Sequence, residues 1–200
     1  MRPNCLNCGA PLTNKFCAQC GQKAEVKWLS LEIDIDTKID LQMEIENYTL
    51  HKLKNGDTIP FDLLLLADET EDAIEKYIYD SDIYTVLTKD NLSPIGVFAL
   101  YKINDSKVEI KNIAILESFR GQDMGSFLIV KIKEIAIRQN YKEIIVGTAD
   151  VAIKEIQFYE KNGFKKYDVK KNFFIENYPE PIIENGIMLK DMIMLKTQIA

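Results

Sequence analysis

Residues 113–126 have the sequence IAILESFRGQDMGS, and this stretch decides the fold. Its apolar first part, residues 113–116, predicts a buried strand, and Arg120-Gly121 begins a glycine-marked turn. Apolar residues then recur at helical spacing from Met124 to Gln139. A helix start presents unpaired N–H groups and the positive end of the macrodipole, so this turn can hold a diphosphate without a metal. Alone the pattern is weak, because any strand-to-helix connection favours a glycine or a capping residue.

The chain on both sides of this stretch alternates between strand and helix patterns. Strands are predicted over residues 48–53, 83–88, 95–103, 107–115, 142–147, 164–174 and 187–197. Helices are predicted over residues 60–67, 69–79, 124–139 and 153–162, and Gly163 ends the last one. This order predicts a mixed α/β domain over residues 48–200.

Two motifs together resemble those of the GNAT N-acetyltransferases. Residues Arg120-Gly121-Gln122-Asp123-Met124-Gly125 resemble the family's acetyl-CoA motif, and Phe158-Tyr159-Glu160-Lys161-Asn162-Gly163-Phe164 is similar to its second motif. A small bacterial branch of the family is also similar at Gly147-Thr148, at residues 178–182 and at residues 184–186. The resemblance covers about residues 48–200. It implies the GNAT fold, in which helices flank a mixed, mostly antiparallel sheet.

The resemblance further implies transfer of an acetyl group from acetyl-CoA directly to an amine of a small molecule or a protein. The strand at Ile113–Ile115 is expected to hydrogen-bond the pantetheine arm and to offer a backbone N–H to the thioester oxygen. On this basis the cofactor-binding residues are Ile113, Ala114, Ile115, Arg120, Gly121, Gln122, Asp123, Met124, Gly125, Ser126, Asp150 and Tyr159.

Two residues are candidates for the proton transfers. Tyr159 aligns with the family tyrosine that protonates the departing thiolate, although a tyrosine after Phe158 on an apolar helix is also a common core residue. Glu109 resembles in placement the glutamate that acts as base in the lysine-acetylating branch. By strand alternation Glu109 shares a face with Lys111, so a solvated ion pair is an equal alternative. Tyr178, Glu180 and Glu184 are candidates for shaping the acceptor site, or for a rigid loop.

Two residues depart from the family pattern. Asp123 occupies the first glycine position of the phosphate turn, and Asp150 stands where the bacterial branch has asparagine. A carboxylate near a diphosphate is unfavourable, whereas an aspartate at a helix N-terminus is locally favourable. Asp123 therefore keeps open a second hypothesis, a catalytically silent acyl-CoA-binding regulatory module with a zinc-ribbon interaction domain.

All four cysteines of the chain lie within residues 1–24, as two Cys-x-x-Cys pairs each followed by glycine. Cys5, Cys8, Cys17 and Cys20 are the predicted ligands of a structural Zn²⁺ ion. The spacing resembles a minimal bacterial zinc ribbon. Disulfides and iron are the alternatives, and a cytoplasmic location disfavours disulfides.

Residues 25–47 form a predicted linker between the ribbon and the domain. Apolar and polar residues alternate from Leu29 to Glu46, and residues 28–47 contain six acids against one lysine. This pattern predicts an acidic amphipathic strand, or two strands with a bend. Its apolar face is expected to cover the following domain, to pair with a second copy as a homodimer, or to bind a protein partner.

Charge and hydropathy restrict the partners and the compartment. A net charge of −6 disfavours a nucleic-acid partner, because phosphate contacts need clustered lysine and arginine. The first residues contain no apolar signal segment, and the longest apolar run, Leu63–Ala67, is too short to span a bilayer. We therefore expect a cytoplasmic protein with no membrane partner.

Overall fold

The computed structural model describes residues 43–45, 48–88, 91–120, 123–184 and 186–199, all of which belong to the compact unit Asp40–Ala200. The predicted zinc ribbon and most of the predicted linker lie outside the described residues. Within the linker, only Met43–Ile45 is described, as strand β1.

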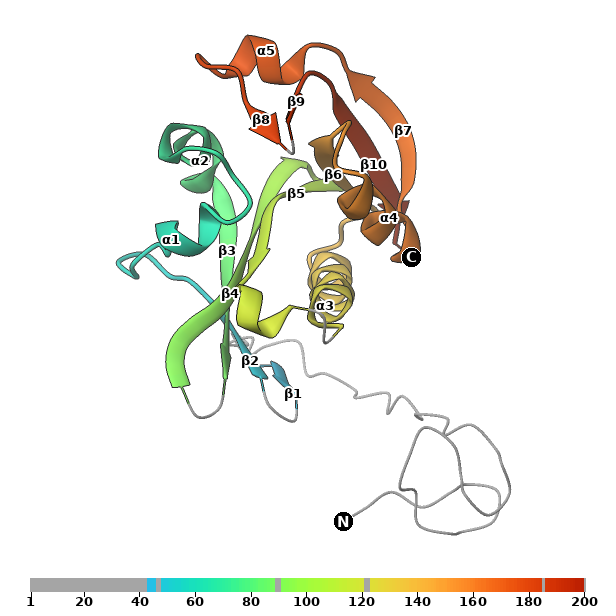
Figure 1. The fold of residues 1–200 in the computed structure, drawn as a ribbon. Coiled ribbons are helices and arrows are strands. Elements are labelled where there is room, and N and C mark those ends of the chain that lie inside the picture. Colours follow the sequence, from blue (N-terminus) through green and yellow to red (C-terminus); the bar gives the residue numbers. More distant parts are fainter. Residues whose placement is uncertain (1–42, 46–47, 89–90, 121–122, 185, 200) are drawn as a thin grey trace, which may run out of the picture. The chain divides into compact units, whose positions relative to one another are not determined.

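One large sheet forms the centre of this unit (Figure 1). Its strands are β1, β2 (Tyr48–Lys52), β3 (Ser81–Thr88), β4 (Asn91–Asn104), β5 (Lys107–Ile115), β6 (Glu143–Ala149), β7 (Lys165–Lys170) and β10 (Met192–Gln198). They lie in the order β1-β2-β3-β4-β5-β6-β10-β7. Only β5 and β6 are parallel, and every other neighbouring pair is antiparallel. The predicted mixed, mostly antiparallel sheet is confirmed.

Helices cover both faces of the sheet. They are α1 (Phe61–Leu64), α2 (Glu71–Ile78), α3 (Met124–Arg138), α4 (Ile153–Lys161) and α5 (Phe173–Asn177). Because side chains alternate along β4, Val97 and Ala99 pack against α1 and α2, whereas Phe98 and Leu100 belong to the core that includes α3. Figure 1 shows α1 and α2 on one side of the sheet and α3 on the other. Two separate apolar cores therefore hold β4 and β5 in place.

The C-terminal part differs from the prediction at two places. The predicted strand 164–174 is wrong in its second half, because Asn172 adopts φ 56° and helix α5 follows. The carboxylate of Asp191 fixes this turn by accepting the Asn172 backbone N–H at 2.9 Å and pairing with Lys171 at 2.6 Å. The predicted strand 187–197 is divided: β9 (Ile187–Met188) pairs with β8 (Ile183–Glu184), and β10 starts only at Met192.

The sheet opens into a wedge between its two parallel strands. Pairing of β5 with β6 extends only from Lys107 with Glu143 to Ile110 with Val146. Lys111 is an extra residue on β5, because Ile110 and Asn112 pair with consecutive residues of β4. Such a bulge bends its strand. From Lys111 onward β5 therefore separates from β6, which leaves residues 111–115 and 147–149 along the two sides of the wedge.

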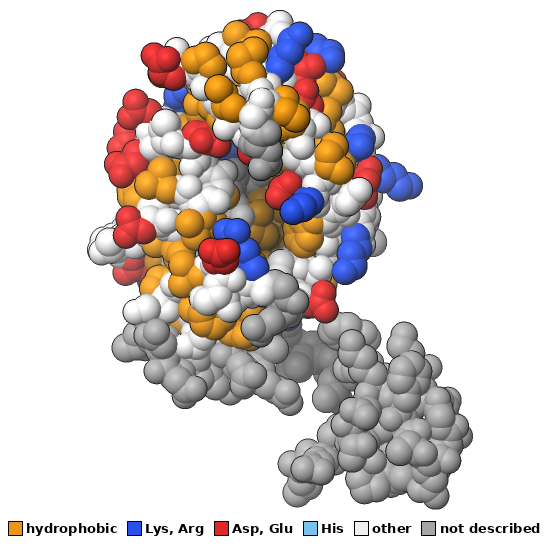
Figure 2. Space-filling model, in the orientation of Figure 1, with side chains coloured by type: hydrophobic (Ala, Val, Ile, Leu, Met, Phe, Trp, Pro, Cys, Tyr) orange, Lys and Arg blue, Asp and Glu red, His pale blue; other side chains and the backbone are white. Residues whose placement is uncertain are grey.

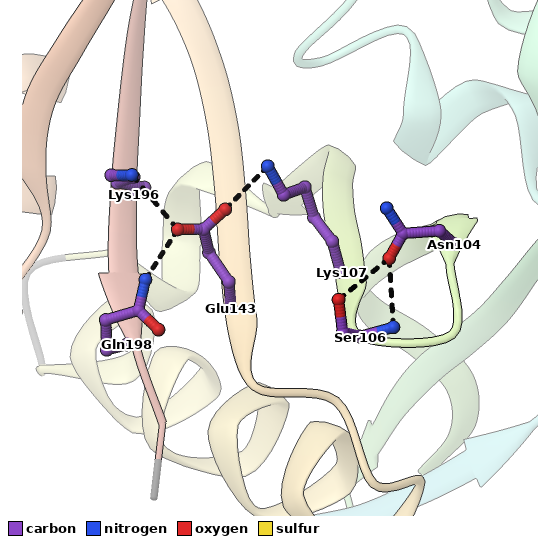
Figure 3. A network of polar contacts seen from close by, with 6 residues as sticks. All are labelled: Asn104, Ser106, Lys107, Glu143, Lys196 and Gln198. Carbon is purple, nitrogen blue, oxygen red and sulfur yellow. Dashed lines mark hydrogen bonds and ion pairs between the residues drawn. The ribbon is translucent and has the colours of Figure 1, made fainter.

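Glu143 ties three strands together at the closed end of the wedge (Figure 3). Its carboxylate pairs with Lys107 of β5 at 2.7 Å and with Lys196 of β10 at 3.1 Å, and it accepts a hydrogen bond from the Gln198 side chain. These contacts hold β5, β6 and β10 together at the end where the strands still pair. The wedge therefore has one fixed end and one open end.

Candidate active site

A cavity of about 770 Å³ occupies the wedge. It is lined by residues 110–115 of β5, residues 146–149 of β6, the start of α3, one side of α4, residues 65–69 after α1, and parts of the segment from α5 to β10. Figure 2 shows the corresponding hollow in the middle of the molecule, with hydrophobic side chains inside it. Segments distant in sequence thus face one space.

The start of α3 forms one end of the cavity. The backbone N–H groups of Met124, Gly125 and Ser126 belong to the first helical turn and have no partner within the helix. A Cβ on Gly125 would lie 3.0 Å from the ring of Phe158, so this glycine permits the close packing of α3 on α4. Arg120 stands beside this turn and donates from Nε to the Ile115 carbonyl at 3.0 Å. This end can hold an anion such as a diphosphate.

Asp123 precedes α3 in the left-handed region, at φ 56°. The conformation explains why a glycine suits this position, and aspartate is among the few other residues that tolerate it. Its side chain is 86% exposed and lies 3.9 Å from the Lys161 ammonium. Water and Lys161 therefore moderate the charge of this carboxylate. Gly121 and Gln122, the other predicted turn residues, lie outside the described residues.

The open part of β5 offers backbone groups to the wedge. The Leu116 N–H bonds back to the Ile95 carbonyl of β4 at 2.9 Å. In an antiparallel pair the backbone groups point alternately to and from the partner strand. Those of Ile113 and Ile115 consequently point away from β4, towards the wedge, where the parallel pairing has already ended. An extended ligand could hydrogen-bond there in the manner of an added strand.

Tyr159 lies on α4 and lines the cavity while remaining 7% exposed. Burial, and to a smaller extent the nearby Glu155, raises the pKa of its phenol well above the ordinary value. Among the described residues, none is hydrogen-bonded to this hydroxyl. The phenol is therefore protonated at neutral pH and able to donate a hydrogen bond to a ligand in the cavity.

Three predicted residues lie outside the cavity lining: Glu109, Asp150 and Glu180. Glu109 is 6% exposed, and its carboxylate pairs with Lys111 at 3.2 Å. The pair is therefore more buried than a solvated surface pair, and the Lys111 ammonium also lies over the rings of Tyr77 and Tyr101. The backbone N–H of Asp150 bonds to the Asp191 carbonyl at 3.0 Å, and neither Glu109 nor Asp150 contacts the cavity. Their roles as base and cofactor ligand stay predictions.

The opposite end of the cavity contains a polar group that the sequence did not reveal. The Asp68 carboxylate accepts from the Tyr77 hydroxyl at 2.6 Å and from the Asn112 amide at 3.0 Å, both on Oδ2. The same Asn112 amide also donates to the Leu64 carbonyl at 2.9 Å. Asp68 lies in an acidic run before α2, and nothing in that run distinguishes it from its neighbours. Only the contact with Asn112, 44 residues later, identifies it.

The fold and the wedge between β5 and β6 define an acyltransferase of the acyl-CoA-binding type, and comparisons with known proteins give the family. Residues 50–164 match the model of the Acetyltransferase (GNAT) family, so the chain belongs to that family. The uncharacterized N-acetyltransferase YvbK of Bacillus subtilis (strain 168) is 36% identical over 135 residues, which make up 68% of this chain and 86% of that protein.

Solved structures support the assignment to this family and the binding of acetyl-CoA. A GNAT family acetyltransferase from Elizabethkingia anophelis with acetyl-CoA bound is 38% identical, with a TM-score of 0.73 over 78% of this chain and 100% of that one. A Bacillus subtilis acetyltransferase in complex with CoA is 32% identical, with a TM-score of 0.68 over 76% and 98%. The described part of this chain contains no helix long and apolar enough to cross a membrane.

Proposed function

We propose that this acetyltransferase transfers the acetyl group of acetyl-CoA directly to an amine of a small molecule or a protein. The observation that supports it is the two-ended wedge. One end presents the free N–H groups of α3 and the other presents polar side chains, and the edge of β5 runs between them. A diphosphate bound at the start of α3 would place the thioester along residues 113–115, where it would face the end of the cavity that carries the polar side chains.

In this proposal the acetyl group moves without an acyl-enzyme. A β5 N–H stabilises the thioester oxygen as it becomes negative during attack. The Tyr159 phenol, which is protonated at neutral pH and lines the cavity, gives its proton to the departing thiolate. The deacylated cofactor leaves as free CoA.

Calorimetry with acetyl-CoA tests the first half of this proposal, and CoA release with a panel of amines tests the second. We expect one molecule of acetyl-CoA bound per chain and amine-dependent CoA release. If the purified protein does not bind acetyl-CoA, both this proposal and the regulatory alternative are wrong.

The silent acyl-CoA-binding module is the second candidate, and Asp123 is the residue that favours it. The Asp123 carboxylate would repel a diphosphate, but its exposure and its position 3.9 Å from the Lys161 ammonium reduce this repulsion and so weaken the case for the second candidate. Binding of acetyl-CoA without CoA release for any amine would favour this second candidate.

We infer that residues 1–24 form a separate zinc ribbon that recruits a protein partner, with residues 25–47 as an acidic linker. The spacing of Cys5, Cys8, Cys17 and Cys20 supports this inference. A partner on the linker, a homodimer and a cytoplasmic location stay predictions of the sequence.

A further inference from the structure

The charges that line the cavity are unequal at its two ends. Around α3 and α4 three cations outnumber two carboxylates (Arg120, Lys154 and Lys161 against Asp123 and Glu155), whereas elsewhere three carboxylates outnumber one cation (Asp68, Glu69 and Glu184 against Lys111). Arg120 and Lys161 lie at the start of α3 and on α4, where the diphosphate would bind. Asp68 and Glu69 lie after α1, at the other end, and residues 62–80 contain seven acids against one lysine. Figure 2 shows acidic side chains gathered on the flank that α2 occupies in Figure 1. This end of the cavity therefore favours a cation.

Asn112 supplies an independent indication of a ligand at this end. Its side chain lines the cavity, is 3% exposed, and donates through Nδ2 to both Leu64 and Asp68. Its Oδ1 is buried without a hydrogen-bond partner. A buried acceptor of this kind costs stability unless a ligand completes it. Asp68, which shares the Asn112 amide and lines the cavity, can accept a hydrogen bond from an ammonium group there.

Asp68 is available as a proton acceptor. Tyr77 and Asn112 occupy its Oδ2, and no described residue is bonded to its Oδ1. Lys111, the nearest cation on β5, has its ion pair with Glu109 instead. Burial raises the pKa of Asp68, against smaller lowering effects of Tyr77, Asn112 and Lys111. Tyr178, whose own pKa is raised chiefly by burial and then by Asp68 and Glu69, faces the same end from the segment after α5.

We propose that Asp68 binds the protonated primary amine of an aliphatic acceptor and removes its first proton, with Tyr77 and Asn112 as positioning residues. The inference rests on the proposed function. The neutral nitrogen then forms the C–N bond and the C–S bond breaks. The thiolate takes the Tyr159 proton, and the nitrogen's second proton restores the phenol. Asp68 releases the first proton to solvent, so each turnover yields one amide, one CoA thiol and one H⁺.

The location of Asn112 on β5 supports this geometry. It immediately precedes Ile113, where the free edge of β5 begins, and therefore lies at the narrow part of the wedge. The three residue steps from Asn112 to Ile115 span about 10 Å, at roughly 3.3 Å per residue. Asp68 is thus placed beside the thioester end of the proposed cofactor path, well away from α3.

The test uses three probes of equal chain length: 1,4-diaminobutane, 1-aminobutane and 4-aminobutanoate. With wild-type protein, kcat/KM for CoA release should be highest for the diamine, lower for the monoamine and lowest for the amino acid. The amino acid should be poorest because Glu69 and Glu184 repel its carboxylate. Asp68→Asn should lower kcat/KM for the diamine about 100-fold. Its acetyl-CoA Kd and Tm should stay within twofold and about 2 °C of wild type.

Two further variants distinguish the role of Asp68. Glu75→Gln, on the exposed face of α2 and outside the cavity, is the matched carboxylate control and should behave as wild type. Tyr77→Phe removes a hydrogen bond that lowers the Asp68 pKa, so the acidic limb of kcat/KM should move to higher pH. A purely structural role of Tyr77 would leave that limb in place.

Three results would overturn the proposal. The first is a kcat/KM for Asp68→Asn equal to that of wild type. The second is a loss of about 100-fold in kcat/KM for Glu109→Gln together with a smaller loss for Asp68→Asn, which would make Glu109 the base. The third is CoA release with none of the three probes by protein that binds acetyl-CoA. If the wild-type protein does not bind acetyl-CoA at all, the proposed function fails instead.

Discussion

The Glu143 carboxylate lies 2.7 Å from the Lys107 ammonium, and this ion pair joins the only two parallel strands of the described sheet at the end away from the wedge (Figure 3). The ion pair therefore holds β5 and β6 together at the end of the sheet opposite the open end of the wedge. Lys196 and Gln198 extend the same contact to β10.

Glu143→Gln should therefore lower the free energy of unfolding by about 1–2 kcal/mol at pH 7, because the carboxylate is buried while its lysines are partly exposed. Lys107 is the main cause of the lowered pKa of Glu143. Because the pKa of Glu143 is lower in the folded than in the unfolded protein, its stabilising effect is fully present above the unfolded-state pKa of about 4.3. The effect is lost as the pH falls from there through the folded-state pKa. Urea denaturation should show the variant converging on wild type below about pH 4.3.

Asp105→Asn is the matched control for this prediction, since its ion pair with Lys102 is exposed to solvent. It should leave the urea midpoint unchanged. A difference between wild type and Glu143→Gln that is the same at pH 7 and pH 3.5 would exclude the ionic explanation.

Removal of the charge at Asp123 should tighten acetyl-CoA binding. Asp123→Asn retains tolerance of the left-handed backbone and should lower the Kd about two- to fivefold at low salt, with less effect at high salt. Asp123→Gly changes the charge in the same way and also removes the Cβ, so any additional gain reports on backbone strain. Calorimetry at low and at high salt measures the acetyl-CoA Kd of both variants. Unchanged affinity in both variants would place the diphosphate away from α3.

Tyr159→Phe should lower kcat about 100-fold and leave the acetyl-CoA Kd unchanged. The lost hydroxyl has no hydrogen-bond partner among the described residues, so the variant should be as stable as wild type. Since the phenol pKa is raised, wild-type kcat should show no alkaline decline due to Tyr159 below pH 9. Tyr84→Phe, a buried tyrosine of the same core outside the cavity, is the control. Undiminished turnover in Tyr159→Phe would show that Tyr159 is a core residue only.

Zinc analysis tests the cysteine pairs. Purified protein should contain one Zn²⁺ per chain, and the double variant Cys5→Ser, Cys8→Ser should contain none, because two thiolates hold the metal too weakly. The acetyl-CoA Kd should be the same in both, since the proposed ribbon precedes the domain. Stoichiometric zinc in the double variant would rule out these ligands.

The sequence alone determined the elements that depend on local pattern. The apolar run at residues 113–116 and the periodicity of residues 124–139 predicted the strand and helix α3 within one residue. Tyr159 was placed correctly on a helix that Gly163 ends, since amphipathic spacing and a glycine C-cap are local signals.

The tertiary structure decided where those elements meet. No local pattern shows that Lys111 is a bulge, because a bulge exists only relative to the partner strand β4. The start of α5 depends on Asp191, a residue 19 positions after the turn that it fixes. Asp68 likewise becomes distinct from its acidic neighbours only through Asn112. Strand register and long-range hydrogen bonds form only when the chain packs, and they placed Asp68 beside Asn112 in the lining of the cavity.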